Sequence, residues 1–125
     1  MTLNKAIENF DSERVNSISL ETKIRWISSL DMKIFSEILS LRGDTEKPCY
    51  TVLTLGDTEL KAPEEYGEIY THYLNMRLDL LNGEIARHNN SAMLFNKMYK
   101  EMFDFINRGE KVSDLKTIKV SDYYV

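Results

Sequence analysis

Apolar residues recur at helical spacing along most of the chain. Leu3, Ile7 and Phe10 fall at i, i+4 and i+7, which predicts a short helix that Thr2 caps and that runs to about Phe10. Ser19 can cap a second helix that runs to Arg42, where Gly43 supplies the C-terminal stop. The core-facing stripe of this second helix, widened by two aromatics, consists of Ile27, Leu30, Ile34, Ile38 and Leu41, with Trp26 and Phe35 beside them.

A third helix is predicted to begin at Pro63, with Glu64 and Glu65 near the positive end of its dipole. Its main apolar stripe reaches Gly83, where we expect a close approach by another helix backbone. We expect the helix to break at 88–90, because Asn89 and Asn90 tolerate turn conformations. A fourth helix then follows and ends at Gly109. The stripes of the two helices are Ile69, Tyr73, Met76 and Leu80 in the third, and Phe95, Met98, Tyr99, Met102, Phe103 and Ile106 in the fourth.

Two further segments complete the predicted fold. Residues 50–55 read as a strand, Gly56-Asp57 as a turn and residues 58–61 as a shorter return strand. The predicted fold is therefore mainly α: a small bundle of about four helices with a short β-hairpin and an extended C-terminal arm. The helical domain covers residues 1–108, with the hairpin inserted at about 50–61, and the arm covers 109–125. Because an isolated hairpin is marginal in water, this one should pack on the helices or pair with another chain.

Length and composition suit one modest core, at 125 residues, 14.6 kDa and 42% hydrophobic residues. The chain has no apolar run long enough to span a bilayer and no signal-peptide pattern, so we expect a soluble protein made in a cytoplasm. A net charge of -4 argues against tight binding of nucleic acid. It is compatible with a conduit through which DNA slides, because such a wall should repel phosphate.

Residues that could carry chemistry are few. His72 and His88 lie in no metal-binding motif, the single Cys49 has no partner, and no glycine-rich phosphate loop is present. We therefore predict no catalytic residue, no cofactor and no metal. Asp31, at the edge of the second helix's apolar face, is more consistent with a structural role, hydrogen-bonded to a neighbouring backbone or basic side chain. Glu84 and His88 could form an acid and base pair, although a surface or interface ion pair is commoner at this spacing.

Several segments, in one order, resemble a family of phage proteins. These are KIRWISSLDMKIFSEI at 23–38, then Leu60, Pro63, Tyr66 and Tyr70, then NGEIARHNNSAMLFN at 82–96, and an aromatic helix that ends in FINR at 105–108. Together they resemble the head-to-tail adaptor proteins, also called connector or head-completion proteins, of long-tailed bacteriophages. The match spans residues 3–108, whereas the loop at 44–58 and the tail beyond Arg108 do not match clearly.

This resemblance implies a non-enzymatic structural protein of the virion neck. Copies would form a ring, commonly a dodecamer, beneath the portal protein, extend the DNA channel without binding DNA specifically, and present a surface to the next neck or tail-completion protein. No contact with a membrane is implied. The portal-binding arm would end in Asp122, Tyr123, Tyr124 and Val125. The contact between subunits would use the hairpin and the end of the third helix, through Tyr50, Val52, Leu53, Leu55, Leu60, Glu84 and Arg87.

Two other classes stay open at this point. A small acidic helical regulator that binds another protein in the host cytoplasm would have the same size and the same lack of chemistry. It would form small complexes rather than rings. A helical enzyme would need a polar cluster in a pocket, and the sequence offers only Asp31, Arg77, Glu84 and His88 for one.

Overall fold

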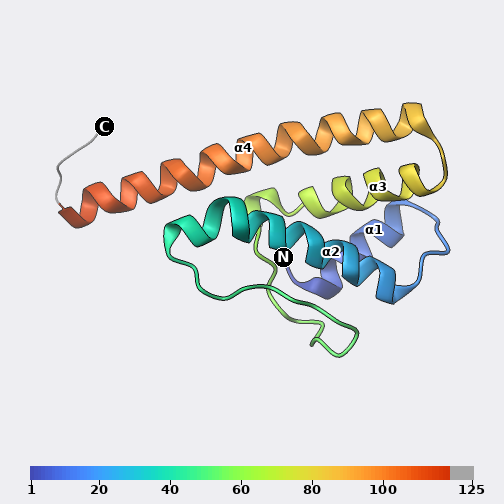
Figure 1. Ribbon diagram of the computed structural model, residues 1–125, viewed down its shortest axis with the longest axis horizontal. Coiled ribbons are helices and arrows are strands. Elements are labelled where there is room, and N and C mark those ends of the chain that lie inside the picture. Colours follow the sequence, from blue (N-terminus) through green and yellow to red (C-terminus); the bar gives the residue numbers. More distant parts are fainter. Residues whose placement is uncertain (119–125) are drawn as a thin grey trace.

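The computed structural model describes residues 1–118 and is mainly helical (Figure 1). Four principal helices are present among these residues, as the sequence predicts. They are α1 (Leu3–Glu13), α2 (Leu20–Ile34), α3 (Ile69–Leu81) and α4 (Ile85–Ile118). Three short elements accompany them: a π-helical turn η1 (Phe35–Leu39), a 3-10 turn η2 (Ser40–Arg42) and a second 3-10 turn η3 (Glu64–Tyr66).

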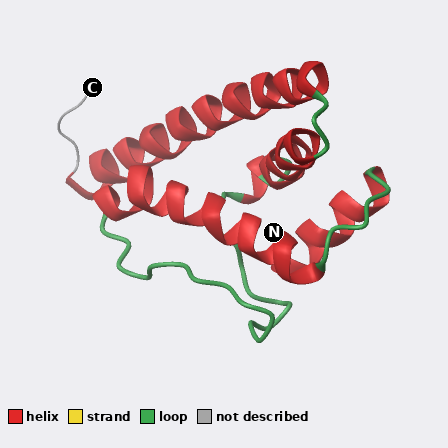
Figure 2. Ribbon diagram, turned by 45° about the vertical axis from the view of Figure 1, so that its right-hand side comes forward, coloured by secondary structure: helices red, strands yellow, loops and turns green. Residues whose placement is uncertain are grey.

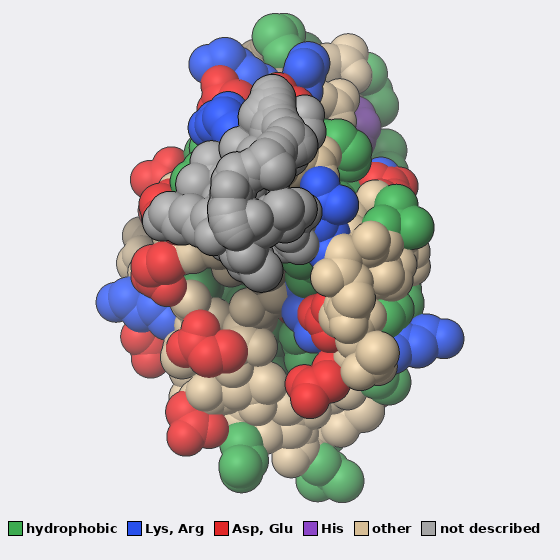
Figure 3. All heavy atoms as spheres, turned by 90° about the vertical axis from the view of Figure 1, so that its left-hand side faces the viewer, with side chains coloured by type: hydrophobic (Ala, Val, Ile, Leu, Met, Phe, Trp, Pro, Cys, Tyr) green, Lys and Arg blue, Asp and Glu red, His purple; other side chains and the backbone are tan. Residues whose placement is uncertain are grey.

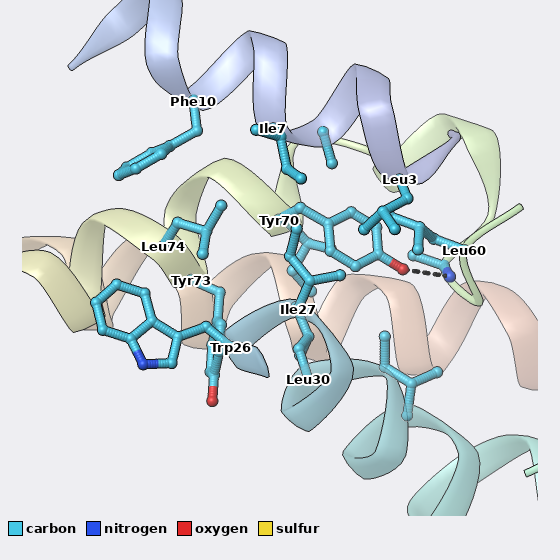
Figure 4. Close-up of a cluster of buried hydrophobic side chains, with 14 of the residues drawn as sticks. Leu3, Ile7, Phe10, Trp26, Ile27, Leu30, Leu60, Tyr70, Tyr73 and Leu74 are labelled. Carbon is cyan, nitrogen blue, oxygen red and sulfur yellow. Dashed lines mark hydrogen bonds between the residues drawn. The ribbon is translucent and has the colours of Figure 1, made fainter. Parts of the chain in front are cut away.

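Helix α3 is the centre of the bundle. It packs against α1, α2 and α4, and α4 runs antiparallel along it (Figures 1 and 2). Because several elements surround it, α3 buries residues around most of its circumference, and no single apolar stripe describes it. Leu74 and Leu78 are therefore buried although they lie outside the predicted stripe, whereas Leu80 of that stripe is exposed. Figure 4 shows Tyr70, Tyr73 and Leu74 of α3 among core side chains of α1 and α2.

The predicted N-caps of the first two helices are confirmed. The Thr2 hydroxyl accepts the Lys5 N–H at 3.2 Å, and the Ser19 hydroxyl accepts the Thr22 N–H at 3.2 Å. The stripe of α2 is buried from Ile27 to Ile38, but Leu41 is exposed. The π-helical turn explains the difference: its wider winding shifts the phase of later residues, so Leu41 rotates away from the core.

The predicted break at 88–90 is wrong, because these residues lie inside α4. The break falls at Asn82-Gly83, where Gly83 has φ +74° and terminates α3 in the left-handed conformation that glycine adopts without strain. A Cβ at Gly83 would meet nothing within 4 Å, so the expected close approach of another helix is also wrong. At its other end α4 passes Gly109 and reaches Ile118. Residues 109–118 are therefore helical rather than an extended arm, and 119–125 lie outside the described residues.

The predicted hairpin at 50–61 is not formed. The segment consists of turns, with one isolated antiparallel bridge between Thr2 and Glu59. Its carbonyl groups serve the first turn of α1 instead of a second strand: the Leu3 N–H donates to Thr58 O at 3.0 Å and the Asn4 N–H to Gly56 O at 2.9 Å. These are N–H groups that a helix start leaves without an internal partner. Capping α1 thus competes with, and replaces, pairing of the loop with itself.

The helices of residues 1–118 include none that is both long enough and apolar enough to cross a membrane.

Candidate interaction surface

The loop at 44–62 carries exposed aliphatic side chains at its far end. Val52, Leu53 and Leu55 are all exposed, and Leu53 keeps 88% of its accessible surface. We call these three residues the loop surface. The loop lies at the lower edge of the molecule in Figure 1, and hydrophobic side chains protrude at the lower edge of the face in Figure 3. On the same face, basic and acidic side chains are interspersed rather than gathered into a basic patch.

A buried carboxylate holds this loop against the helices. Asp31 of α2 is fully buried and accepts three hydrogen bonds, two of them from the loop. The Tyr50 hydroxyl donates to Oδ2 at 2.6 Å, and the Lys61 N–H donates to the same oxygen at 3.0 Å. The hydroxyl of Tyr70, from α3, donates to Oδ1 at 2.5 Å. Asp31 therefore joins the loop, α2 and α3, and the structural role predicted for it is confirmed.

The electrostatics of this cluster follow from its burial. Burial raises the pKa of Asp31 above its ordinary value, while the hydrogen bonds from Tyr50, Tyr70 and Lys61 act in the opposite direction. Burial, together with the neighbouring Asp31, also raises the pKa of the Tyr50 and Tyr70 hydroxyls. Both hydroxyls thus remain protonated donors toward Asp31.

Further contacts fix the two ends of the loop. The Tyr50 N–H donates to the Ser28 hydroxyl at 3.1 Å, and the Lys61 ammonium pairs with Asp44 at 2.9 Å. The Tyr70 hydroxyl accepts the Ala62 N–H at 2.9 Å. With its ends anchored in this way, the loop presents its aliphatic tip in a defined position even though it contains no strand.

A second exposed aliphatic surface lies where α3 turns into α4. Leu81 keeps 62% of its accessible surface, and its exposed neighbours belong to the end of α3 and the start of α4. The turn is at the upper right of Figure 1, away from the loop. We call this group the corner surface, and its members are Leu80, Leu81, Ile85, Met93 and Leu94.

Another buried carboxylate fixes the corner. Asp79 is fully buried, and it pairs with the Arg14 guanidinium at 2.8 Å and accepts the Ser91 hydroxyl at 3.0 Å. These contacts join α3 to α4 and to the residue that follows α1. Nearby, Nδ1 of His88 lies 3.0 Å from Met76 O, a geometry in which the imidazole N–H donates to the carbonyl. His88 thus links α4 to α3 through Nδ1, which contacts Met76 O.

The residues predicted for a contact between subunits include exposed, half-buried and buried side chains. Val52, Leu53, Leu55, Glu84 and Arg87 are on the surface, and Glu84 pairs with Arg87 at 3.1 Å. Tyr50 is half-buried, with its hydroxyl committed to Asp31. Leu60 is only 6% exposed and packs in the core, so its predicted place on the surface is wrong. The predicted portal-binding residues, Asp122, Tyr123, Tyr124 and Val125, lie outside the described residues.

Sequence reasoning located the corner only through Glu84 and Arg87. It missed the exposed aliphatic side chains there because it placed Leu80 on the apolar stripe of a longer third helix. The signal that could have located them is Asn82-Gly83, a dipeptide that marks turns. Asp79 was also missed, since its partners Arg14 and Ser91 are distant in sequence.

The described residues contain no group of three His, Cys, Asp or Glu side chains that could hold a metal ion. A hollow of about 230 Å³ lies beside the loop surface and is lined by Glu21, Ile24, Arg25, Tyr50, Thr51 and Val52. It is smaller than the pockets of roughly 300–1,000 Å³ that hold drug-sized ligands. Its size suits an inserted side chain better than a bound metabolite.

Comparison of the chain with protein families, with curated proteins and with solved structures finds no match.

We predict that Asp31→Asn changes how stability depends on pH. A raised pKa means that the folded state binds the proton more tightly than the unfolded state, so protonation of Asp31 stabilises the wild type. As pH falls from neutral toward the ordinary value of 3.8, the wild type should gain stability relative to Asp31→Asn. Urea unfolding of both proteins at several pH values measures this. Other carboxylates cancel in the difference, and a difference independent of pH would contradict the prediction.

A pair of substitutions separates the tip of the loop from its anchor. Leu53→Ala should change the free energy of unfolding by no more than about 0.5 kcal/mol, because exposed positions contribute little. Leu60→Ala should cost about 2–5 kcal/mol, because it removes core packing. Chemical denaturation of the two variants checks both values. A large loss in Leu53→Ala would show that the loop surface serves the fold.

Proposed function

We propose that this chain is a head-to-tail adaptor of a long-tailed bacteriophage, a structural protein whose copies form a ring under the portal. The ring extends the DNA channel and joins the capsid to the neck or tail. The chain acts without cofactor or catalytic residue. It contacts its own copies, the portal and the next neck protein.

The observation that carries this proposal is the pair of exposed aliphatic surfaces on one small domain. The loop surface and the corner surface are unlike each other and lie on different parts of the molecule (Figures 1 and 2). A ring of identical subunits needs two different, mutually complementary surfaces on every copy, because each subunit contacts one neighbour with each of them.

The segments that resemble adaptor proteins also support the proposal by where they fall. KIRWISSLDMKIFSEI covers most of α2 and its π-helical turn, including Asp31. Tyr70 donates to Asp31, and Leu60 is buried in the same core. NGEIARHNNSAMLFN forms the corner and the first part of α4. The resemblance therefore includes both the residues that fix the bundle and one of its two exposed aliphatic surfaces.

Charge is compatible with a passage for DNA. The net charge is -4. Several basic side chains form salt bridges with carboxylates of the same chain, such as Lys61 with Asp44 and Arg87 with Glu84. A wall of this kind would not grip phosphate, whereas a DNA-binding protein uses clustered, unpaired Lys and Arg.

Native mass spectrometry of the protein mixed with the portal assembly from the same genome tests the proposal. We expect the portal mass to increase by a full ring of subunits, which also gives the copy number. A portal mass that stays unchanged at micromolar excess of the protein would contradict the adaptor function. Small complexes with another host or phage protein would then favour a regulator.

The C-terminal residues 122–125 keep the role of a portal-docking arm in this proposal. Deleting Asp122–Val125 should weaken attachment to the portal without lowering the helical content of residues 1–118, since the core lies in the bundle. The same mass measurement, together with circular dichroism, checks both effects. Attachment equal to that of the full chain would refute the arm.

A further inference from the structure

We propose that the corner surface of one copy packs into the hollow beside the loop surface of the next copy. This inference rests on the proposed ring and deepens it by assigning which surface meets which. The occupant of the hollow is thus a second copy of this chain, inserting aliphatic side chains from the end of its α3 and the start of its α4.

Both surfaces have the composition of an interface core. Residues 48–56 contain no charged side chain, and residues 80–96 contain only Glu84 and Arg87. The chain as a whole is 29% charged, and α4 resumes this character at once with Lys97, Lys100 and Glu101. The centre of a protein interface is depleted in charged residues in the same way. These two depleted segments, each of which carries exposed aliphatic side chains, are therefore the best candidates for the partners of one contact.

The lining of the hollow is suited to this contact. Its walls come from α2 and from the loop, and they combine the side chains of Ile24, Tyr50 and Val52. Of these residues Ile24 is buried, whereas Val52 is exposed. Leu81 and Ile85 are exposed on the corner surface and are of a size to enter. Burying them removes apolar surface from water, at about 25 cal/mol for each Å².

Charges at the rims of the two surfaces are complementary. Glu21 and Arg25 lie one helical turn apart on α2 at the hollow, and both are exposed. Glu84 and Arg87 lie one turn apart at the corner and are also exposed. Each rim thus has one acid and one base, and docking with the two pairs antiparallel sets Arg25 against Glu84 and Glu21 against Arg87. Opposed charges of this kind fix the register of an interface more than they add affinity.

The two surfaces differ, so the contact repeats from copy to copy instead of closing as a twofold dimer. Cross-linking tests this directly, because a repeating contact links many copies, whereas a twofold contact links only two. The background variant is Cys49→Ser, which removes the only native thiol. Adding Val52→Cys and Leu81→Cys places one thiol at the hollow and one at the corner. Both positions are exposed, so neither substitution removes core packing.

The sample is this variant mixed with portal under mild oxidation, analysed on a non-reducing gel. We expect a ladder of covalent species larger than dimers. The matched control pairs Val52→Cys with Lys97→Cys, which is exposed on α4 outside the corner surface. The control and each single-cysteine variant should give nothing larger than a dimer.

Native mass spectrometry of the same samples separates the two proposals. A complete ring on the portal without a ladder would overturn the inference and leave the adaptor function standing. A ladder without binding to portal would support the contact while refuting the adaptor function. The absence of both ring and ladder would overturn both.

Discussion

The buried carboxylate of Asp31 is the constraint on which the rest of this structure depends. A carboxylate in a core is costly unless hydrogen bonds compensate it, and here three donors from the loop and from α3 offset part of that cost. The same donors would be left without a partner if the loop moved away. The loop of residues 44–62 has no strand and few core residues of its own, yet it is held by a polar contact at the centre of the bundle. Asp31 is therefore the central contact that orders the loop, and the anchors at Ser28, Asp44 and Tyr70 and the hydrogen bonds to α1 act with it.

Helical periodicity predicted the elements well where one face of a helix meets the core. The caps at Thr2 and Ser19 and the buried stripe of α2 follow from local rules that need no partner. Prediction was wrong where a distant partner decides the outcome. Helix α3 packs against α1, α2 and α4, so a single apolar stripe does not show which of its residues are buried. The carbonyl groups of the loop accept hydrogen bonds from the first turn of α1. Residues 50–61 therefore form turns, although their sequence is typical of a hairpin. The end of α3 was missed for a local reason: Gly83 terminates the helix through its positive φ, a backbone property that apolar spacing does not reveal.

The candidate surfaces could be predicted only in part, for a related reason. The sequence does not distinguish an exposed leucine from a buried one. Leu53 and Leu60 belong to the same loop, yet Leu53 is exposed and Leu60 is buried. The prediction identified the exposed tip at Val52, Leu53 and Leu55 because the segment is apolar, but it included Leu60 for the same reason. At the corner only Glu84 and Arg87 were predicted, and the exposed aliphatic residues were missed because their exposure depends on where α3 ends. Where apolar periodicity does not show which face of a helix is exposed, the lack of charged residues over 80–96 still indicates a candidate interface.

A ring imposes a requirement that a dimer does not: the angle between the two contact surfaces must be the same in every copy, or the assembly does not close. In this chain each surface is fixed by its own buried carboxylate. Asp31 fixes the loop, and Asp79, through Arg14 and Ser91, fixes the corner. Both carboxylates reach α3, Asp31 through Tyr70 and Asp79 as part of that helix, so one rigid element carries the geometry from one surface to the other. Buried polar networks of this kind contribute little net stability compared with apolar packing, but their directional hydrogen bonds favour one arrangement of their partners. In the ring that we propose, every copy must repeat one angle, so a unique arrangement of these contacts matters more than additional stability.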